Sequence, residues 1–174
     1  MLEKLGFKKR THIGISLSAN NFIELVCIDK DTKNVVKYVS RNVKYNNAIK
    51  EIVDFDEFAE VLSSLFEEAD LEPADCAVTL SVPNVHFDLT TLEENTDDLY
   101  VRENLQAEIE DLYIFKRNEP YISYTIKDGG SKSLGKKVIY SAIQLKMLNI
   151  IIEIFDSLGA DLVRIDSSYV SMLK

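Results

Sequence analysis

Short runs of β-branched and other apolar residues, separated by polar turns, form the first pattern along this chain. They cover residues 12–17, 22–29 and 34–41. Ser-Ala-Asn-Asn at 18–21 and Lys-Asp-Thr-Lys at 30–33 separate these runs, and both have compositions typical of turns. The pattern predicts two consecutive hairpins, in which three strands form an antiparallel meander.

An amphipathic helix is predicted next, over residues 55–69. Asp54 followed by Glu57 has the pattern of a capping box at its start. An apolar strand over 76–82 follows and ends at Pro83. Three strands, a crossover helix and a further strand make an α/β unit, with the helix covering one sheet face. The apolar residues at helical spacing are Phe55, Phe58, Val61, Leu62, Leu65, Phe66 and Ala69.

A second unit restarts after Pro83. It consists of a strand over 85–92, a helix over 97–113 and two strands over 121–127 and 137–143. Thr96 is the expected N-cap of the helix, because Asp97 and Asp98 suit the positive end of the helix dipole. Asp-Gly-Gly-Ser at 128–131 has the composition of a hairpin loop. The order of this unit is therefore strand, helix, strand, strand.

A third helix is predicted over 144–158, and Gly159 fits its C-terminal cap. A strand over 161–166 follows. Residues 167–174 have the pattern of a helix that begins and stops after about two turns. The chain is therefore expected to be the first part of a larger protein.

Composition and charge limit the functional classes. The chain has 174 residues, of which 46% are hydrophobic and 28% charged, as expected of a folded domain. Its net charge of -9 argues against nucleic acid as a main partner. The basic leader 1–10 is the local exception: it is expected to be a mobile tail or, alternatively, an amphipathic segment on an anionic membrane. No apolar run approaches the roughly 20 residues of a spanning helix, so a cytoplasmic location is expected.

Candidate chemistry is sparse. Cys27 and Cys76 lie inside apolar strand-like runs, where a thiol is expected to be buried and reduced. His12 and His86 show no zinc-ligand spacing with them, so no metal site is expected. No nucleophile, P-loop or dinucleotide-binding motif occurs. The carboxylates of Glu103, Glu108, Glu110 and Asp111 are expected to form a solvated helix face rather than an acid and base pair.

Four motifs, in order and spacing, resemble the PilM family of type IV pilus assembly proteins. They are His-Ile-Gly-Ile-Ser-Leu at 12–17, Leu-Ser-Val-Pro at 80–83, Glu-Ile-Glu-Asp-Leu-Tyr-Ile-Phe at 108–115, and Ser-Leu-Gly-Ala-Asp-Leu-Val-Arg-Ile-Asp at 157–166. The resemblance covers the whole chain and implies the amino-terminal half of an actin-like fold of the FtsA/PilM type.

The implied fold class is α/β (α+β) with two subdomains. Residues 11–83 would form the ribonuclease-H-like subdomain 1A. Residues 84–166 would form the strand-helix-strand-strand subdomain 1C, of the SHS2 type shared with FtsA. Residues 167–174 would begin a helix returning to subdomain 1A.

The resemblance also implies a first phosphate loop, over Ser16, Ser18, Ala19, Asn20 and Asn21, as a degenerate nucleotide site. The family typically has Asp, Gly and Lys where this sequence has Ser16, Ser18 and Ile23. Losing the Asp removes the group that orients the metal, and losing the Gly places a β-carbon where backbone approaches phosphate. We therefore expect no enzyme activity and no cofactor in this chain. ATP with magnesium is expected only in a full-length parent.

The implied role is a cytoplasmic scaffold, peripheral at the inner membrane, that binds the cytoplasmic tail of a PilN-like membrane protein. In the family this tail docks near the junction of the two subdomains. Ser81, Val82 and Pro83 are the candidate contacts there, or alternatively form a simple crossover between subdomains. Other pilus platform proteins are further candidate partners. The alternative function is an ATP-binding actin homologue, related to cell division or type II secretion.

Overall fold

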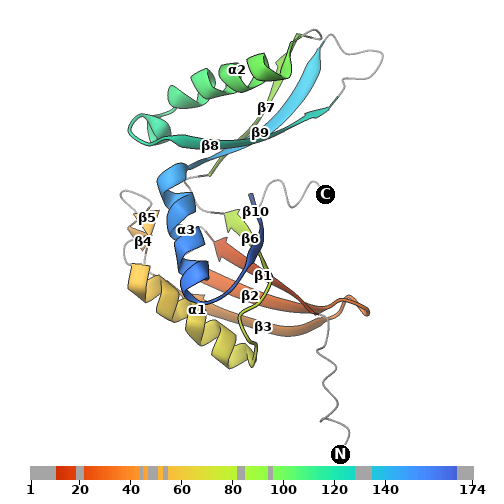
Figure 1. The fold of residues 1–174 in the computed structure, drawn as a ribbon, viewed down its shortest axis with the longest axis vertical. Coiled ribbons are helices and arrows are strands. Elements are labelled where there is room, and N and C mark those ends of the chain that lie inside the picture. The colour runs from red at the N-terminus through yellow and green to blue at the C-terminus, as the bar shows by residue number, and fades with distance from the viewer. Residues whose placement is uncertain are drawn as a thin grey trace, which may run out of the picture.

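The chain folds into two bodies that meet at a junction (Figure 1). The computed structural model describes residues 11–18, 22–43, 45–46, 51–52, 55–81, 85–93, 96–127 and 135–167. One body is a five-stranded sheet with two helices, and the other is a three-stranded sheet with one helix. A separate pair of two-residue strands, β4 (Tyr45–Asn46) and β5 (Glu51–Ile52), forms a small hairpin that the sequence pattern did not predict.

The five-stranded sheet has the strand order β10-β6-β1-β2-β3. Strands β1 (Thr11–Ser18), β2 (Phe22–Asp29) and β3 (Val35–Asn42) form the predicted antiparallel meander. Strands β6 (Cys76–Ser81) and β10 (Leu162–Ser167) extend it in parallel with β1. The carboxyl ends of β1, β6 and β10 therefore lie at the same edge of the sheet.

Helices α1 (Phe55–Ala69) and α3 (Leu145–Ser157) cover one face of this sheet (Figure 1). Alternation along the strands sends Ile13, Ile15 and Leu17 to that face, where each is 5% exposed or less. The cysteines Cys27 and Cys76 are buried and free of disulfide bonds, so their predicted burial is confirmed. This face and the two helices form the first hydrophobic core.

The three-stranded sheet has the order β7-β9-β8 and is antiparallel throughout. Its strands are β7 (Val85–Leu92), β8 (Pro120–Lys127) and β9 (Lys136–Gln144). Helix α2 (Asp98–Glu110) and the short 3-10 helix η1 (Tyr113–Phe115) pack on one face only. The second core, around Leu105, shares no buried residue with the first.

Strand β9 passes directly into α3 and so ties the two bodies together. Gln144 is the last residue of β9, and its side chain is 6% exposed. Its Nε2 donates to the carbonyl of Ile114 at 2.8 Å. The backbone N–H of Leu145 donates to the carbonyl of Glu119, also at 2.8 Å. The three-stranded body is therefore hydrogen-bonded to the start of α3.

Three boundary predictions need correction. The N-cap of α2 is Asp97 and not Thr96, because Asp97 has the extended backbone and its Oδ1 accepts from Leu99 N at 3.2 Å. The helix ends at Glu110, since Leu112 is extended and η1 follows. Ser167 ends β10 and does not start a helix. Residues 168–174 and the predicted cap residue Asp54 lie outside the described residues.

Gly159 is the predicted C-terminal cap of α3, and this prediction is confirmed. Its φ is +70°, a left-handed conformation that glycine adopts without a steric penalty. Its N–H donates to the carbonyl of Asp156, and the next N–H, of Ala160, donates to Phe155. These two bonds satisfy carbonyls at the helix end, so the chain turns sharply into β10.

Candidate functional site

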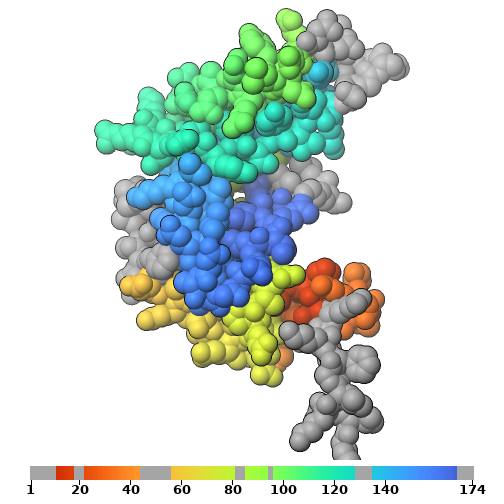
Figure 2. All heavy atoms as spheres, in the orientation of Figure 1, coloured from red at the N-terminus to blue at the C-terminus, as the bar shows by residue number. Residues whose placement is uncertain are grey.

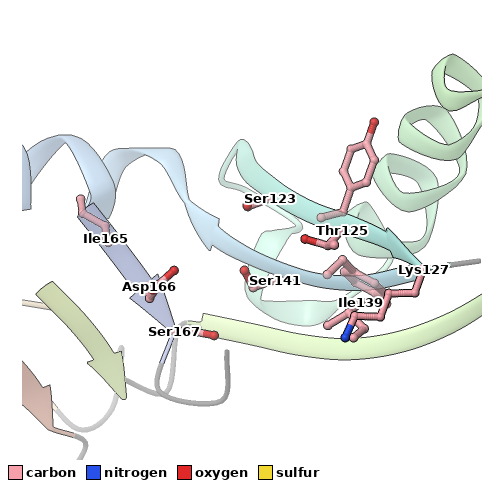
Figure 3. A pocket seen from close by; sticks show the side chains of 10 residues that line it. Ser123, Thr125, Lys127, Ile139, Ser141, Ile165, Asp166 and Ser167 are labelled. Atoms are coloured by element: carbon pink, nitrogen blue, oxygen red, sulfur yellow. The ribbon is translucent and has the colours of Figure 1, made fainter. Parts of the chain in front are cut away.

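A cleft lies where the three-stranded sheet faces the end of β10, with a volume of about 300 Å³. One wall comes from β8 and β9, and the other from the last residues of β10. In the space-filling view the two bodies form separate lobes that touch along the blue segment containing α3 (Figure 2). Figure 3 shows Ser123 and Ser141 on one wall and Asp166 on the other. The described residues lining the cleft are Ser123, Tyr124, Thr125, Lys127, Ile139, Tyr140, Ser141, Ile165, Asp166 and Ser167.

The sheet wall of the cleft is the face that α2 does not cover. Strand pairing sorts its residues into four rows running from β7 across β9 to β8. We call this surface the open face. Its rows are Val85–Ile143–Tyr121, Phe87–Ser141–Ser123, Leu89–Ile139–Thr125 and Thr91–Lys137–Lys127.

The open face is apolar toward β7 and polar toward β8. Leu89 is 51% exposed and Tyr121 is 52% exposed, so the open face presents apolar and aromatic surface to solvent. Ser123 and Thr125 beside them offer hydroxyls that both donate and accept hydrogen bonds. The surface can therefore bury apolar side chains and satisfy polar backbone groups at the same time.

The opposite wall carries a balanced charge pair. Arg164 Nε and Asp166 Oδ2 are 2.5 Å apart on the same side of β10. The Asp166 carboxylate hydrogen-bonds the guanidinium and raises the pKa of Arg164 above its ordinary value. Asp166 lines the cleft, and its ion pair with Arg164 balances its charge.

A smaller cavity of about 60 Å³ extends the cleft toward the connection between the two bodies. It shares Ser123, Ser141 and Asp166 with the larger space. Leu80 from β6, Val85 from β7 and Leu148 from α3 also line it. The cleft therefore follows the open face from the joint between the bodies toward the outer end of the sheet.

The lining of the cleft offers groups that can bind a polypeptide. Its described lining holds hydroxyls, apolar side chains, Lys127 and a neutralised carboxylate, with no His or Cys among them. Within the described ranges, no group of three His, Cys, Asp or Glu residues could hold a metal ion. β8 is an edge strand, and edge strands carry backbone groups that can pair with an extended segment. An extended polypeptide is the ligand that this arrangement fits.

Solved structures share this fold. A PilM–PilN type IV pilus biogenesis complex matches with a TM-score of 0.70 and 16% identity, over 91% of this chain and 48% of that chain. The fold is PilM-like. The cytoplasmic domain of EpsL, an inner membrane component of the Vibrio cholerae type II secretion system, matches with a TM-score of 0.55 and 8% identity. That match covers 90% of this chain and 57% of EpsL's domain.

The chain spans about half the length of the PilM–PilN structure that it matches, since the match covers 48% of that chain. No protein-family model matches the sequence. No curated protein matches it either. The PilM-like fold is thus established from the arrangement of the strands and helices, with little identity of sequence.

Among the predicted nucleotide residues, Ser16 lies on the face of the five-stranded sheet opposite α1 and α3, and it is not part of the cleft lining. Ser16 on β1 pairs with Glu24 on one side and Thr79 on the other, and Thr79 pairs with Asp166. Ser18 ends β1. Ala19, Asn20 and Asn21 lie outside the described residues, so the degenerate loop stays a prediction.

The predicted partner contacts lie next to the smaller cavity. Ser81 ends β6, while Val82 and Pro83 lie outside the described residues. Their neighbours on either side, Leu80 and Val85, line the smaller cavity. A role for these three residues in partner binding stays a prediction.

Sequence analysis missed most of the cleft, although one signal was available. Along β8, half-buried Ile122, Tyr124 and Ile126 alternate with exposed residues. Alternation of this kind puts Ser123, Thr125 and Lys127 on one exposed face. The residues of β9 and β10 join them only through the folded arrangement.

Two other polar contacts belong to the second core. Tyr140 is 1% exposed, and its hydroxyl donates to Glu108 Oε1 at 2.9 Å. Burial and the nearby carboxylate raise the pKa of Tyr140 above its ordinary value. The His86 and Tyr140 ring centroids are 5.7 Å apart. These contacts lie on the α2 side of the sheet, away from the open face.

Proposed function

We propose that this chain is a non-catalytic scaffold of a type IV pilus or related secretion assembly. We further propose that its junction cleft binds the cytoplasmic tail of a PilN-like membrane protein. The observation that carries this proposal is the cleft of about 300 Å³ between the open face and β10, in a chain with a PilM-like fold. The matched structure is itself a complex of PilM with PilN, and the second match belongs to an inner membrane secretion component.

The physical character of the cleft supports a tail as its ligand. Its volume lies at the lower end of the range of about 300–1,000 Å³ for small ligand sites, so it accommodates only a short segment. Tyr121 in the smaller cavity and Leu89 on the adjoining open face are exposed and gain from burial, while the serine and threonine hydroxyls of the cleft can satisfy a peptide backbone. A short, extended and partly apolar segment fits the small volume, buries the exposed apolar surface and offers backbone groups to the hydroxyls.

The scaffold would lie in the cytoplasm and reach the inner membrane through its partner. No helix in the described residues is long and apolar enough to cross a membrane. The non-catalytic part of the proposal rests on Ser16 and Ser18, which stand where the PilM family typically has Asp and Gly. Nucleotide binding is the alternative function.

Isothermal titration calorimetry with a peptide of the PilN-like tail from the same organism tests the proposal. Saturable binding is expected for the unmodified chain, with no heat from magnesium ATP titrated separately. Ser123→Arg places a long side chain in the cleft from an exposed position and is expected to weaken binding by about tenfold or more. Asn42→Arg, at an exposed position on edge strand β3, is the matched control and should bind normally.

Two results would count against the proposal. Equal binding by Ser123→Arg and Asn42→Arg would place the tail elsewhere on the molecule. No heat from the tail together with saturable binding of magnesium ATP would favour the nucleotide-binding alternative.

A further inference from the structure

The outer end of the open face carries two lysines in direct register. Lys127 on β8 pairs with Lys137 on β9, and Thr91 completes the row on β7. Both lysines are exposed. Like charges directly opposite each other on a sheet destabilise it, so this row favours a ligand that brings negative charge.

The positive charge of this row stands out against its surroundings. The chain has 29 acidic and 20 basic residues, yet Lys127 and Lys137 are the charged residues of the four open-face rows. Within the described part of the chain, neither lysine takes part in an ion pair. On the facing wall, Arg164 already meets the charge of Asp166. The open face therefore carries net positive charge at its outer end, where Lys127 lines the cleft.

Each of the three rows before the lysines has an apolar residue on β7. Phe87 lies in the second row, and Leu89 and Ile139 lie in the third. Consecutive rows are two residues apart along each strand, or about 6.7 Å. An extended peptide that runs along the strands advances by the same distance for every two of its residues. Its alternate side chains would therefore meet successive rows.

We infer that the occupant of the cleft extends along the adjoining open face, and that it is an extended segment with two apolar side chains two residues apart and an Asp or Glu two residues beyond the second. The apolar side chains pack on Phe87, Leu89 and Ile139. The carboxylate binds between Lys127 and Lys137. The segment can bind in either N-to-C direction, because the rows determine the spacing of its side chains and not the direction of its backbone. This inference rests on the proposed function and adds the sequence class of the tail.

Three peptides based on the PilN-like tail test the spacing. The first is the native peptide, the second replaces the acidic residue by its amide, and the third moves the acidic residue by one position. The amide is expected to weaken binding by about 2- to 5-fold, as for an exposed ion pair. The shifted peptide should bind as weakly as the amide, because one residue turns the carboxylate to the opposite side of an extended chain.

Charge reversal on the protein gives the complementary test. Lys127→Glu and Lys137→Glu should each lower the affinity for the native peptide. A further peptide has Lys in place of its acidic residue, and both variants should bind it more tightly than the unmodified chain does. Lys37→Glu, at an exposed position on β3, is the control and should leave binding unchanged. Raising the salt concentration to about 0.5 M should lower the affinity of the unmodified chain for the native peptide and leave its affinity for the amide peptide nearly unchanged. Circular dichroism of each variant checks that the fold is intact.

The results separate this inference from the proposed function. A native tail that binds in the cleft and has no Asp or Glu at this spacing overturns the inference alone. Equal affinity of the three peptides, with no salt dependence, also overturns it while the cleft remains the docking site. No binding of the native tail to the unmodified chain defeats the proposed function, and the inference with it.

Discussion

Leu105→Ala tests whether the three-stranded body has a core of its own. Leu105 is 0% exposed and lies in the second core with Val101, Ile109, Val138 and Tyr140. The substitution removes three buried carbons, worth about 2.4 kcal/mol by transfer at about 0.8 kcal/mol each. The cavity left behind raises the expected loss of stability to about 2.5–5 kcal/mol.

Native-state hydrogen exchange measures where this loss falls. Protection of the β8 and β9 amides should drop steeply, because these strands enclose the second core. Protection in β1 and β2 should change much less, since the buried residues of the two cores do not overlap. Leu99→Ala in the same helix is the control, because Leu99 is 69% exposed and its loss should cost about 0.5 kcal/mol or less.

Two outcomes would refute the reasoning on Leu105. An equal fall of protection in β1, β2, β8 and β9 would mean that the chain unfolds as one cooperative unit. Unchanged protection in β8 and β9 would mean that Leu105 does not support the sheet that forms the open face.

Three further predictions concern single side chains. Tyr140→Phe removes the hydrogen bond to Glu108 and should cost about 0.5–1.5 kcal/mol in urea unfolding at neutral pH. Because the folded-state pKa of Tyr140 is raised above its ordinary 10.0, the unmodified chain should lose stability above about pH 10 more steeply than this variant. Gly159→Ala forces a φ of +70° on a residue with a β-carbon and should lower thermal stability by about 1–2 kcal/mol. Burial raises the pKa of Cys76 to about 11, so iodoacetamide should alkylate it far more slowly in the folded chain than in urea. A loss of stability smaller than about 0.5 kcal/mol would contradict the prediction for Tyr140→Phe. Unchanged stability of Gly159→Ala, or equal alkylation rates of Cys76 in the folded and the urea-unfolded chain, would contradict the other two.

Secondary structure followed from local patterns in this chain. Alternation of apolar residues located β1, β2 and β9, and helical spacing located α1 and α3, because each of these elements buries one regular face. Gly159 was predictable because a helix end commonly needs one residue in the left-handed conformation. These features depend on residues that are neighbours in sequence.

Some local boundaries were not predictable. Thr96 and Asp97 are both good capping residues, and the choice depends on which one has an extended backbone. The apolar spacing of Leu112 continues that of α2, although its backbone is extended and the helix ends earlier. The two-residue strands β4 and β5 are too short to show alternation.

The cleft was beyond sequence reasoning for a different reason. Lys127 and Lys137 come together through the pairing of β8 with β9, and Asp166 joins the lining from a strand of the other sheet. No local pattern gives the register between strands or the placement of β10 beneath the open face. The junction was nevertheless the expected neighbourhood, because the resemblance to the PilM family implied it.

The most direct test of the central claim is to map the tail onto the chain by nuclear magnetic resonance. Backbone amide shifts would be followed while the PilN-like tail peptide is added to the labelled protein. The account predicts that the largest changes fall in β8, β9 and the end of β10, around Ser123, Ser141 and Ser167. Changes confined to β1, β2 and β3, with none around the cleft, would contradict it.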